Sequence, residues 1–240
     1  MNVVVICEEN NINKTPSLNN IPKQFMPMVN GKSTFQNILL GFEYLKTDDL
    51  LFQKSIEINR FIIICKKEHH SIIEEQIKEL ELEEHYTIVT EPMGKDTAAV
   101  VATAALMGDS DDISLVVPCD DHVFNDEEFC NVVKMGYNNY VDNTISTFKM
   151  NPKYPETTDI FMFQNRTMIT CFEEYVSSIF TPCLDAAIKS LGTIDDHTIH
   201  LDEEEFLKCP KISMEYAIID NLIKDTSSDI KVINLTFFLE

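Results

Sequence analysis

Two adjacent carboxylates are the side chains in this sequence best suited to bind a metal ion. Asp120 and Asp121 follow closely on the apolar run Ser114 to Val117, so they stand just beyond the end of a predicted strand. Carboxylate oxygens, together with substrate phosphates, are the ligands that Mg²⁺ prefers. Asp120 and Asp121 therefore have the residue type that a metal site needs. An acidic turn that caps a helix would place the same residue types there without a metal.

Polar residues also follow the other apolar runs. The four strand ends are Cys7-Glu8-Glu9, Cys65-Lys66-Lys67, Thr90-Glu91-Pro92 and Pro118-Cys119-Asp120-Asp121. The carboxyl ends of parallel strands form one edge of a sheet, and ligands bind outside that edge. The sequence therefore predicts a single ligand site built from these strand ends.

Hydrophobic periodicity predicts the elements that position this edge. Four continuous apolar runs are typical of strands buried on both faces: Val3 to Cys7, Phe61 to Cys65, Tyr86 to Val89 and Ser114 to Val117. Segments with helical spacing or helix-forming composition follow them: Ser33 to Leu45, His70 to Leu82, Asp96 to Met107 and Glu127 to Tyr140. This alternation predicts an α/β fold, a Rossmann-like and mostly parallel sheet with helices on both faces.

The rhythm changes after Thr147. Strands are predicted at Ile160 to Phe163 and Ile230 to Leu235, and helices at Thr167 to Ile179, Leu184 to Leu191 and Ser213 to Ile223. The acidic stretch Asp195 to Glu205 reads as a solvated loop or helix edge. We expect one domain over residues 1–240, with a first half at 1–150 and a shortened second half at 151–240.

Composition excludes several classes of protein. With 240 residues and 44% hydrophobic content the chain can bury one sizeable core, and it holds no 18-residue apolar run that would cross a membrane. The first residues show neither a basic stretch nor a cleavage-like segment, so we expect no secretory signal. The seven scattered cysteines include no CxxC pair, which favours a reducing, cytoplasmic location over a disulfide scaffold.

The charge is strongly acidic. Forty acidic residues against 19 basic ones give a net charge of −21, which repels the phosphates of nucleic acids. We therefore expect no nucleic-acid partner. Nucleoside triphosphates are repelled as well, unless a local basic group or a metal ion compensates.

Six segments, in order along the chain, resemble motifs of the mannose-1-phosphate guanylyltransferase family. They are Pro22-Lys23-Gln24-Phe25 with Gly31-Lys32-Ser33, Cys65 to His69 with Glu75-Gln76, Glu91 to Ala98, Val117 to His122, Tyr154 to Thr157, and Ser213 to Ala217. The resemblance implies a GT-A-like nucleotidyltransferase fold whose first half binds the nucleotide. It also implies nucleotide-binding roles for Lys23, Glu91, Gly94, Lys95, Asp96 and Thr97, and it makes Asp120 and Asp121 the metal candidates.

The glycine-rich phosphate loop of that family is missing. Aligned without a gap, its glycines fall on Cys7, Glu8 and Asn10, and its arginine falls on Ile12. Glycines let backbone N–H groups close on a triphosphate, and the arginine neutralises its charge. Glu8 and Glu9 reverse that charge, at a cost of roughly 4 kcal/mol for each carboxylate–phosphate contact at ~4 Å in a dielectric of about 20.

Two further family features are absent. Thr157 to Asp159 runs almost directly into the strand at Ile160, so the segment that contacts sugar phosphate in the family is lost. The chain contains no tryptophan. It therefore lacks the family's W-x-D-V-G-x-W element, whose aspartate is a second metal ligand in that family.

The sequence therefore predicts a degenerate, non-catalytic member of this family that needs no cofactor. It would bind GTP or GDP-mannose, or act as a structural or interaction protein through a partner or by self-assembly. The alternative is an active enzyme that makes GDP-mannose from GTP and mannose 1-phosphate with Mg²⁺. That enzyme would depend on Lys23, the residual catalytic candidate, and on Lys14 and Asp121.

Overall fold

An eight-stranded sheet forms the centre of the protein. The structure is a computed structural model that describes residues 1–7, 21–46, 55–80, 86–119, 127–150, 157–193 and 197–237. The strand order is β7-β3-β2-β1-β4-β6-β5-β8, and β6 alone runs antiparallel to its neighbours. The strands are β1 (Asn2–Cys7), β2 (Arg60–Lys66), β3 (Tyr86–Glu91), β4 (Ile113–Pro118), β5 (Thr144–Met150), β6 (Thr157–Gln164), β7 (Thr198–His200) and β8 (Lys231–Phe237). The predicted mostly parallel α/β sheet is confirmed.

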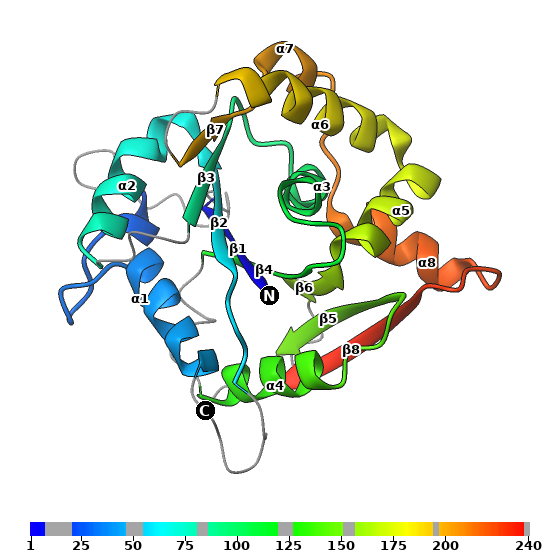
Figure 1. The fold of residues 1–240 in the computed structure, drawn as a ribbon, viewed down its shortest axis with the longest axis horizontal. Coiled ribbons are helices and arrows are strands. Elements are labelled where there is room, and N and C mark those ends of the chain that lie inside the picture. Colours follow the sequence, from blue (N-terminus) through cyan, green and yellow to red (C-terminus); the bar gives the residue numbers. More distant parts are fainter. Residues whose placement is uncertain are drawn as a thin grey trace.

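Helices cover both faces of the sheet (Figure 1). One face carries α1 (Thr34–Gly41), α2 (His70–Lys78) and α4 (Glu127–Asn138), which pack with the sheet into one hydrophobic core. The other face carries α3 (Thr97–Met107), α5 (Asn165–Tyr175), α6 (Ser177–Ser190), α7 (Glu203–Phe206) and α8 (Asp220–Lys224), over a second core. Short helical turns are η2 (Lys23–Phe25), η3 (Phe42–Lys46), η4 (Lys67–His69), η5 (Leu191–Thr193) and the π-helical turn η6 (Glu215–Ile219). Among the described residues no helix is long and apolar enough to cross a membrane.

The second half contains elements that the sequence did not predict. The helix predicted at Thr167 to Ile179 is interrupted at Val176, whose φ of −145° and ψ of 55° lie outside the helical range. The next helix, α6, begins seven residues before its predicted start and includes Pro182. Proline disfavours a helix interior. Here the buried residues Ile179 and Cys183 pack α6 against the core, and this packing outweighs the local preference.

Within the acidic stretch predicted as a solvated loop or helix edge, the described residues form an unpredicted strand, β7, and then the start of the short helix α7. β7 adds to the edge of the sheet by pairing with β3, with Ile88 N donating to His197 O at 2.8 Å. Asp202 then caps α7 by accepting a hydrogen bond from Glu205 N at 3.0 Å. A three-residue strand is too short to show periodicity, and only its neighbour in the sheet defines it.

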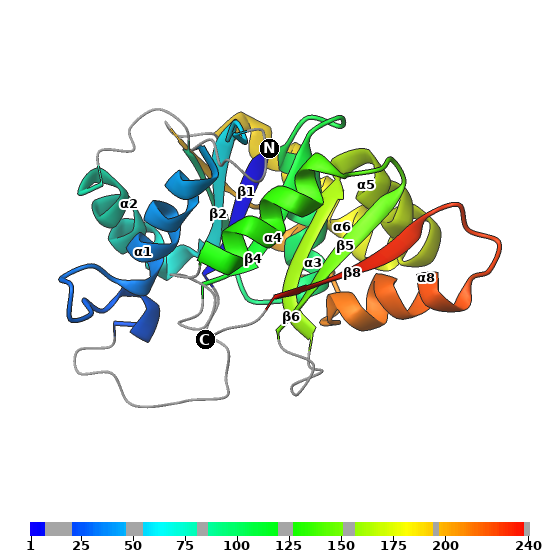
Figure 2. The same ribbon diagram turned by 90° about the horizontal axis from the view of Figure 1, so that it is seen from below.

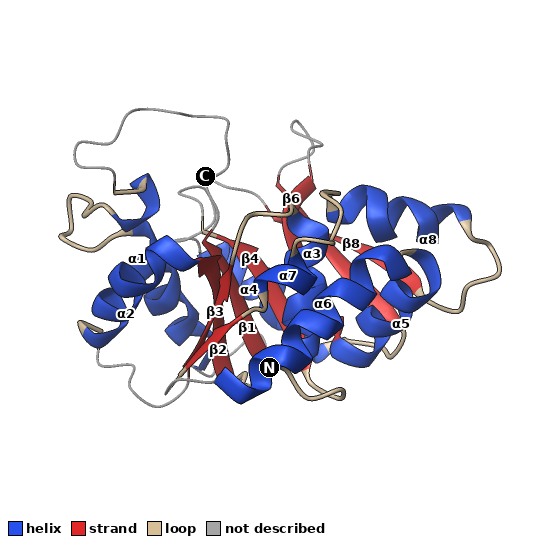
Figure 3. Ribbon diagram, turned by 90° about the horizontal axis from the view of Figure 1, so that it is seen from above, coloured by secondary structure: helices blue, strands red, loops and turns tan. Residues whose placement is uncertain are grey.

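The carboxyl ends of the parallel strands meet at one edge, as predicted. Because β6 is antiparallel to β4, the start of β6 and therefore Asp159 lie at this same edge. β5 and β8 also end there, side by side with β6 in the order β6-β5-β8 (Figure 2). In Figure 3 the N-terminus, where β1 begins, lies at the opposite edge of the sheet from the start of β6.

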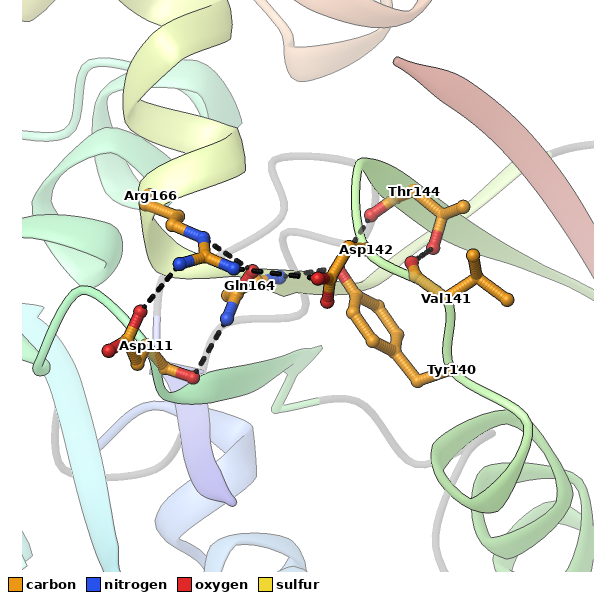
Figure 4. Close-up of polar contacts among 7 residues, drawn as sticks. All are labelled: Asp111, Tyr140, Val141, Asp142, Thr144, Gln164 and Arg166. Carbon is orange, nitrogen blue, oxygen red and sulfur yellow. Dashed lines mark hydrogen bonds and ion pairs between the residues drawn. The ribbon is translucent and has the colours of Figure 1, made fainter. Parts of the chain in front are cut away.

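The amino edge is closed by polar contacts (Figure 4). Arg166, near the start of α5, donates to Asp111 Oδ1 and to Gln164 Oε1, both at 2.9 Å. Gln164 Nε2 donates to Asp111 O at 3.1 Å. These hydrogen bonds connect the segment just before β4 with the end of β6 and the start of α5.

Candidate nucleotide-binding site

The loop between β3 and α3 holds most of the predicted nucleotide-binding residues in a strained conformation. Asp96 caps α3, with its carboxylate accepting from Thr97 N at 2.8 Å. Its φ of 73° and ψ of 172° lie in a region that is almost reserved for glycine, at a cost of about 1–3 kcal/mol. Among the described residues of this loop the positive φ belongs to Asp96, and not to Gly94. Strained backbone of this kind persists only where surrounding contacts enforce it, and it is found mostly at active sites and ligand-binding sites.

A segment from the other half of the chain holds this loop in place. We call residues 207–214 the strap. Lys95 Nζ donates to Leu207 O at 2.9 Å, Met214 N donates to Thr97 Oγ1 at 2.9 Å, and Ala98 N donates to Ile212 O at 3.2 Å. Two motifs that lie more than a hundred residues apart, Glu91 to Ala98 and Ser213 to Ala217, are therefore in direct contact.

Glu91 lies beneath the loop. Its side chain is fully buried at the end of β3. Burial and the charge of Glu91 together raise the pKa of the Cys65 thiol to about 12. Glu91 thus contributes to the floor of the site, whereas Lys95, Asp96 and Thr97 are partly exposed.

Asp96 and Glu215 both act electrostatically on Asp159, and we call these three carboxylates the acidic cluster. Burial, then Asp96 and Glu215, raise the pKa of Asp159. Burial and Asp220 raise the pKa of Glu215, while Lys149 at the end of β5 opposes that shift. Sequence reasoning did not select Asp159 or Glu215. The family motif at Ser213 to Ala217 was the available signal for Glu215, but Asp159 had none.

Substituting Asp159 with asparagine should stabilise the protein at neutral pH. The raised pKa means that the folded state binds this proton more tightly than the unfolded chain, so ionised Asp159 costs stability near pH 7. Removing the charge should raise the Tm by about 2–4 °C for each kcal/mol that burial of the charge, and then repulsion by Asp96 and Glu215, now cost. The gain should shrink as the pH falls through the raised pKa toward the ordinary value, because wild-type Asp159 then becomes protonated. Differential scanning calorimetry across pH measures this.

Asparagine suits the test because it tolerates the left-handed φ of 53° that Asp159 adopts. Asp229→Asn is the matched control, since it removes one negative charge from an exposed position. An equal gain from both variants at pH 7 would show that only net charge matters, and would count against repulsion within the acidic cluster.

The first family motif, which contains Lys23, packs against α2. Lys23 is exposed and begins η2. Gln76 of α2 donates to Phe25 O at 2.8 Å and accepts from Ser33 Oγ at 2.6 Å. The motif pieces at Pro22 to Phe25, Gly31 to Ser33 and Glu75-Gln76 therefore form one packed unit, which positions the backbone that carries Lys23.

The metal candidates Asp120 and Asp121 lie outside the described residues, as do the residues of the altered phosphate loop from Glu8 onward. In the described ranges, no group of three or more His, Cys, Asp or Glu side chains is placed to hold a metal ion. Cys7 lies opposite Cys65 in the sheet and interacts with Cys119, and burial raises its pKa well above the usual value. The described residues alone therefore do not supply a magnesium site.

Comparisons with known proteins agree with this fold and these motifs. The nucleotidyl transferase family model matches residues 21–174, more than half of the chain. A mannose-1-phosphate guanylyltransferase of Salmonella montevideo is 32% identical over 137 residues, covering 57% of this chain and 26% of the relative. One from Escherichia coli (strain K12) is 27% identical over 236 residues, covering 75% of this chain and 49% of the relative.

Structural comparison extends the likeness to nearly the whole chain. A crystal structure from Helicobacter pylori, described as mannose-6-phosphate isomerase, has a TM-score of 0.70 at 17% identity and covers 98% of this chain and 97% of its own. This identity supports a shared fold alone. The chain spans about half or less of the length of the two curated relatives. Because the family model matches more than half of the chain, including the ends of β2, β3 and β4 and the loop described above, the chain belongs to the nucleotidyl transferase family.

Proposed function

We propose that this chain is a non-catalytic binder of a nucleotide sugar of the GDP-mannose type. The observation that carries the proposal is the loop from Glu91 to Thr97, held in a strained conformation by three hydrogen bonds to the strap. Strain of this kind persists only where the surroundings enforce it, which favours a preformed binding loop. The family motif at this loop and the guanylyltransferase relatives support a guanine nucleotide as the ligand.

The acidic cluster favours a diphosphate sugar over a triphosphate. Asp96, Asp159 and Glu215 place negative charge beside the loop: after burial, the charges of Asp96 and Glu215 are the causes that raise the pKa of Asp159. A nucleoside triphosphate brings more negative charge to this edge than a nucleotide sugar does. Repulsion between like charges disfavours the more highly charged ligand.

Thermal stability with GTP, GDP-mannose and ATP, each with and without Mg²⁺, tests the proposal. A ligand present at about 100 times its Kd adds roughly 2.7 kcal/mol to the native state, which is several degrees of Tm for a domain of this size. We expect GDP-mannose to raise the Tm without Mg²⁺ and the triphosphates to have little effect. A shift with GTP that requires Mg²⁺ would instead favour the active enzyme, and no shift with any ligand would favour a scaffold protein.

A pair of threonine variants connects the effect to the loop. Thr97→Ala removes the acceptor for Met214 N, whereas Thr170→Ala removes a hydroxyl that donates to Arg166 O on the exposed side of α5. Each variant is compared with and without ligand, so that its own baseline Tm cancels. The ligand-induced shift should be lost in Thr97→Ala and kept in Thr170→Ala. Equal shifts in both would show that the strapped loop does not bind the ligand.

A further inference from the structure

Two buried thiols join α6 to the strap. The Sγ atoms of Cys183 in α6 and Cys209 in the strap are 3.9 Å apart. Their exposed fractions are 0% and 2%, so both lie in the protein interior. The sulfur atoms of a disulfide are about 2.05 Å apart, so bonding requires an approach of about 2 Å. Cys209 lies in the short segment that follows the four-residue α7.

We infer that Cys183 and Cys209 form a modification site, at which a reversible disulfide fastens the strap to α6. The strap also holds the loop from Glu91 to Thr97, through Lys95, Thr97 and the backbone. The disulfide would therefore join α6, the strap and the loop into one covalently restrained unit. This inference stands on the two sulfur atoms and is independent of which ligand the loop binds.

The two thiols have different roles in the chemistry. The contact with the Cys183 thiol, and then the positive charge of Lys95, lower the pKa of Cys209 despite its burial. The pKa of Cys183 is raised, first by Cys209 and then by burial. A thiolate is the reactive form of cysteine. Lys95 Nζ donates to Leu207 O, two residues before Cys209, and its positive charge favours the thiolate at Cys209. We therefore take Cys209 as the attacking sulfur and Cys183 as the resolving one.

A peroxide is the class of oxidant that completes the reaction. The Cys209 thiolate attacks one peroxide oxygen, the O–O bond breaks, and a sulfenic acid forms as the first water leaves. The Cys183 sulfur then attacks the Cys209 sulfur, the S–S bond forms, the S–O bond breaks and a second water leaves. Two thiols lose two hydrogen atoms, and one peroxide is reduced to two waters. A dithiol reverses the change by exchange.

Cys209 is also better placed for a small oxidant than the cysteines at the strand ends. Its chain neighbours Leu207, Lys208 and Lys211 are exposed, so Cys209 belongs to a segment that lies at the protein surface. Cys7 is fully buried, and its burial and its interaction with Cys119 raise its pKa. A high pKa keeps Cys7 as an unreactive thiol.

Mass spectrometry of the full chain tests the inference. The reduced protein is treated with hydrogen peroxide in slight excess, and the intact mass should fall by two hydrogen atoms. Peptide mapping should place the disulfide between Cys183 and Cys209. The oxidised form should melt about 5–10 °C higher, because a disulfide restricts the unfolded chain, and dithiothreitol should reverse both changes.

Serine variants test which cysteine attacks the peroxide and which one then closes the disulfide. Cys183→Ser should accumulate a sulfenic acid at Cys209 that a dimedone probe traps, and Cys209→Ser should give neither product. Cys171→Ser, which alters another buried cysteine on α5, should form the disulfide normally. Should the first two variants fail to fold, differential alkylation of the oxidised wild type identifies the protected pair. An unchanged mass, or a disulfide mapped to any other pair, would overturn the inference.

Discussion

The purified chain should release no pyrophosphate above background from GTP and mannose 1-phosphate with Mg²⁺. Transfer of a nucleotidyl group depends on groups that neutralise the triphosphate as charge develops. At the phosphate loop this sequence has Cys7, Glu8 and Asn10 where the family has glycines, and Ile12 where the family has an arginine. Direct assay of pyrophosphate and GDP-mannose, with the Escherichia coli relative assayed in parallel, measures the result. Formation of GDP-mannose above background would falsify the prediction.

A partial rebuilding of the phosphate loop makes this test sharper. Glu8→Gln with Ile12→Arg removes one negative charge and adds one positive charge where the triphosphate would approach. We expect GTP to bind at least about tenfold more tightly, which corresponds to ~1.4 kcal/mol. Glu204→Gln with Ile223→Arg changes the net charge equally at two exposed positions outside the loop. Equal gains in both double variants would assign the effect to overall charge and not to the phosphate loop.

Gly108→Ala should destabilise the fold by about 2–4 kcal/mol and lower the Tm by roughly 5–15 °C. A Cβ atom at Gly108 would lie 2.4 Å from Asn165 Nδ2 and 2.7 Å from Asn2 Nδ2. Both asparagines are fully buried. Asn165 also accepts from Ser114 Oγ at 2.7 Å and donates to Asp109 O at 2.8 Å. Moving its amide would break hydrogen bonds where water cannot replace them.

Gly41→Ala is the matched control for this substitution. Gly41 ends α1, and an added Cβ atom there meets nothing within 4 Å. Alanine favours a helix over glycine by roughly 0.5–1 kcal/mol, so this variant should gain slightly in stability. Thermal or urea unfolding of both variants measures the difference. A loss at Gly108 no larger than the change at Gly41 would show that the asparagines move aside freely.

The clash in Gly108→Ala lies at the other edge of the sheet from the candidate site. Its effect on folding can therefore be distinguished from an effect on ligand binding. Asn2 begins β1 and pairs in register with Ser114 in β4, so the network lies at the amino edge, opposite the candidate site. Folded Gly108→Ala protein should therefore keep its ligand-induced Tm shift. Loss of that shift in a folded sample would mean that the two edges are coupled.

Part of the fold could be predicted because buried strands and helices have recognisable patterns of apolar residues in the sequence. The strands β1 to β4 are continuous apolar runs, which is how strands covered on both faces appear in a sequence. The helices between them show apolar spacing or an alanine-rich composition. The order of these elements then limits the topology to a mostly parallel sheet. β7 and the helix break at Val176 were missed, because pairing and packing with distant residues define them.

In the candidate site, too, some features could be predicted from the sequence and others depend on the tertiary structure. The sequence by itself determined the loop from Glu91 to Thr97 and the carboxyl edge to which it belongs, because strand order and chain direction decide which ends meet. Only the tertiary structure showed that Asp159 and Glu215 join Asp96, that the strap holds the loop, and that Cys183 faces Cys209. Met214 contacts Thr97 across 117 positions of the chain. Periodicity records whether a residue is buried, but the contact between distant residues depends on how the whole chain packs.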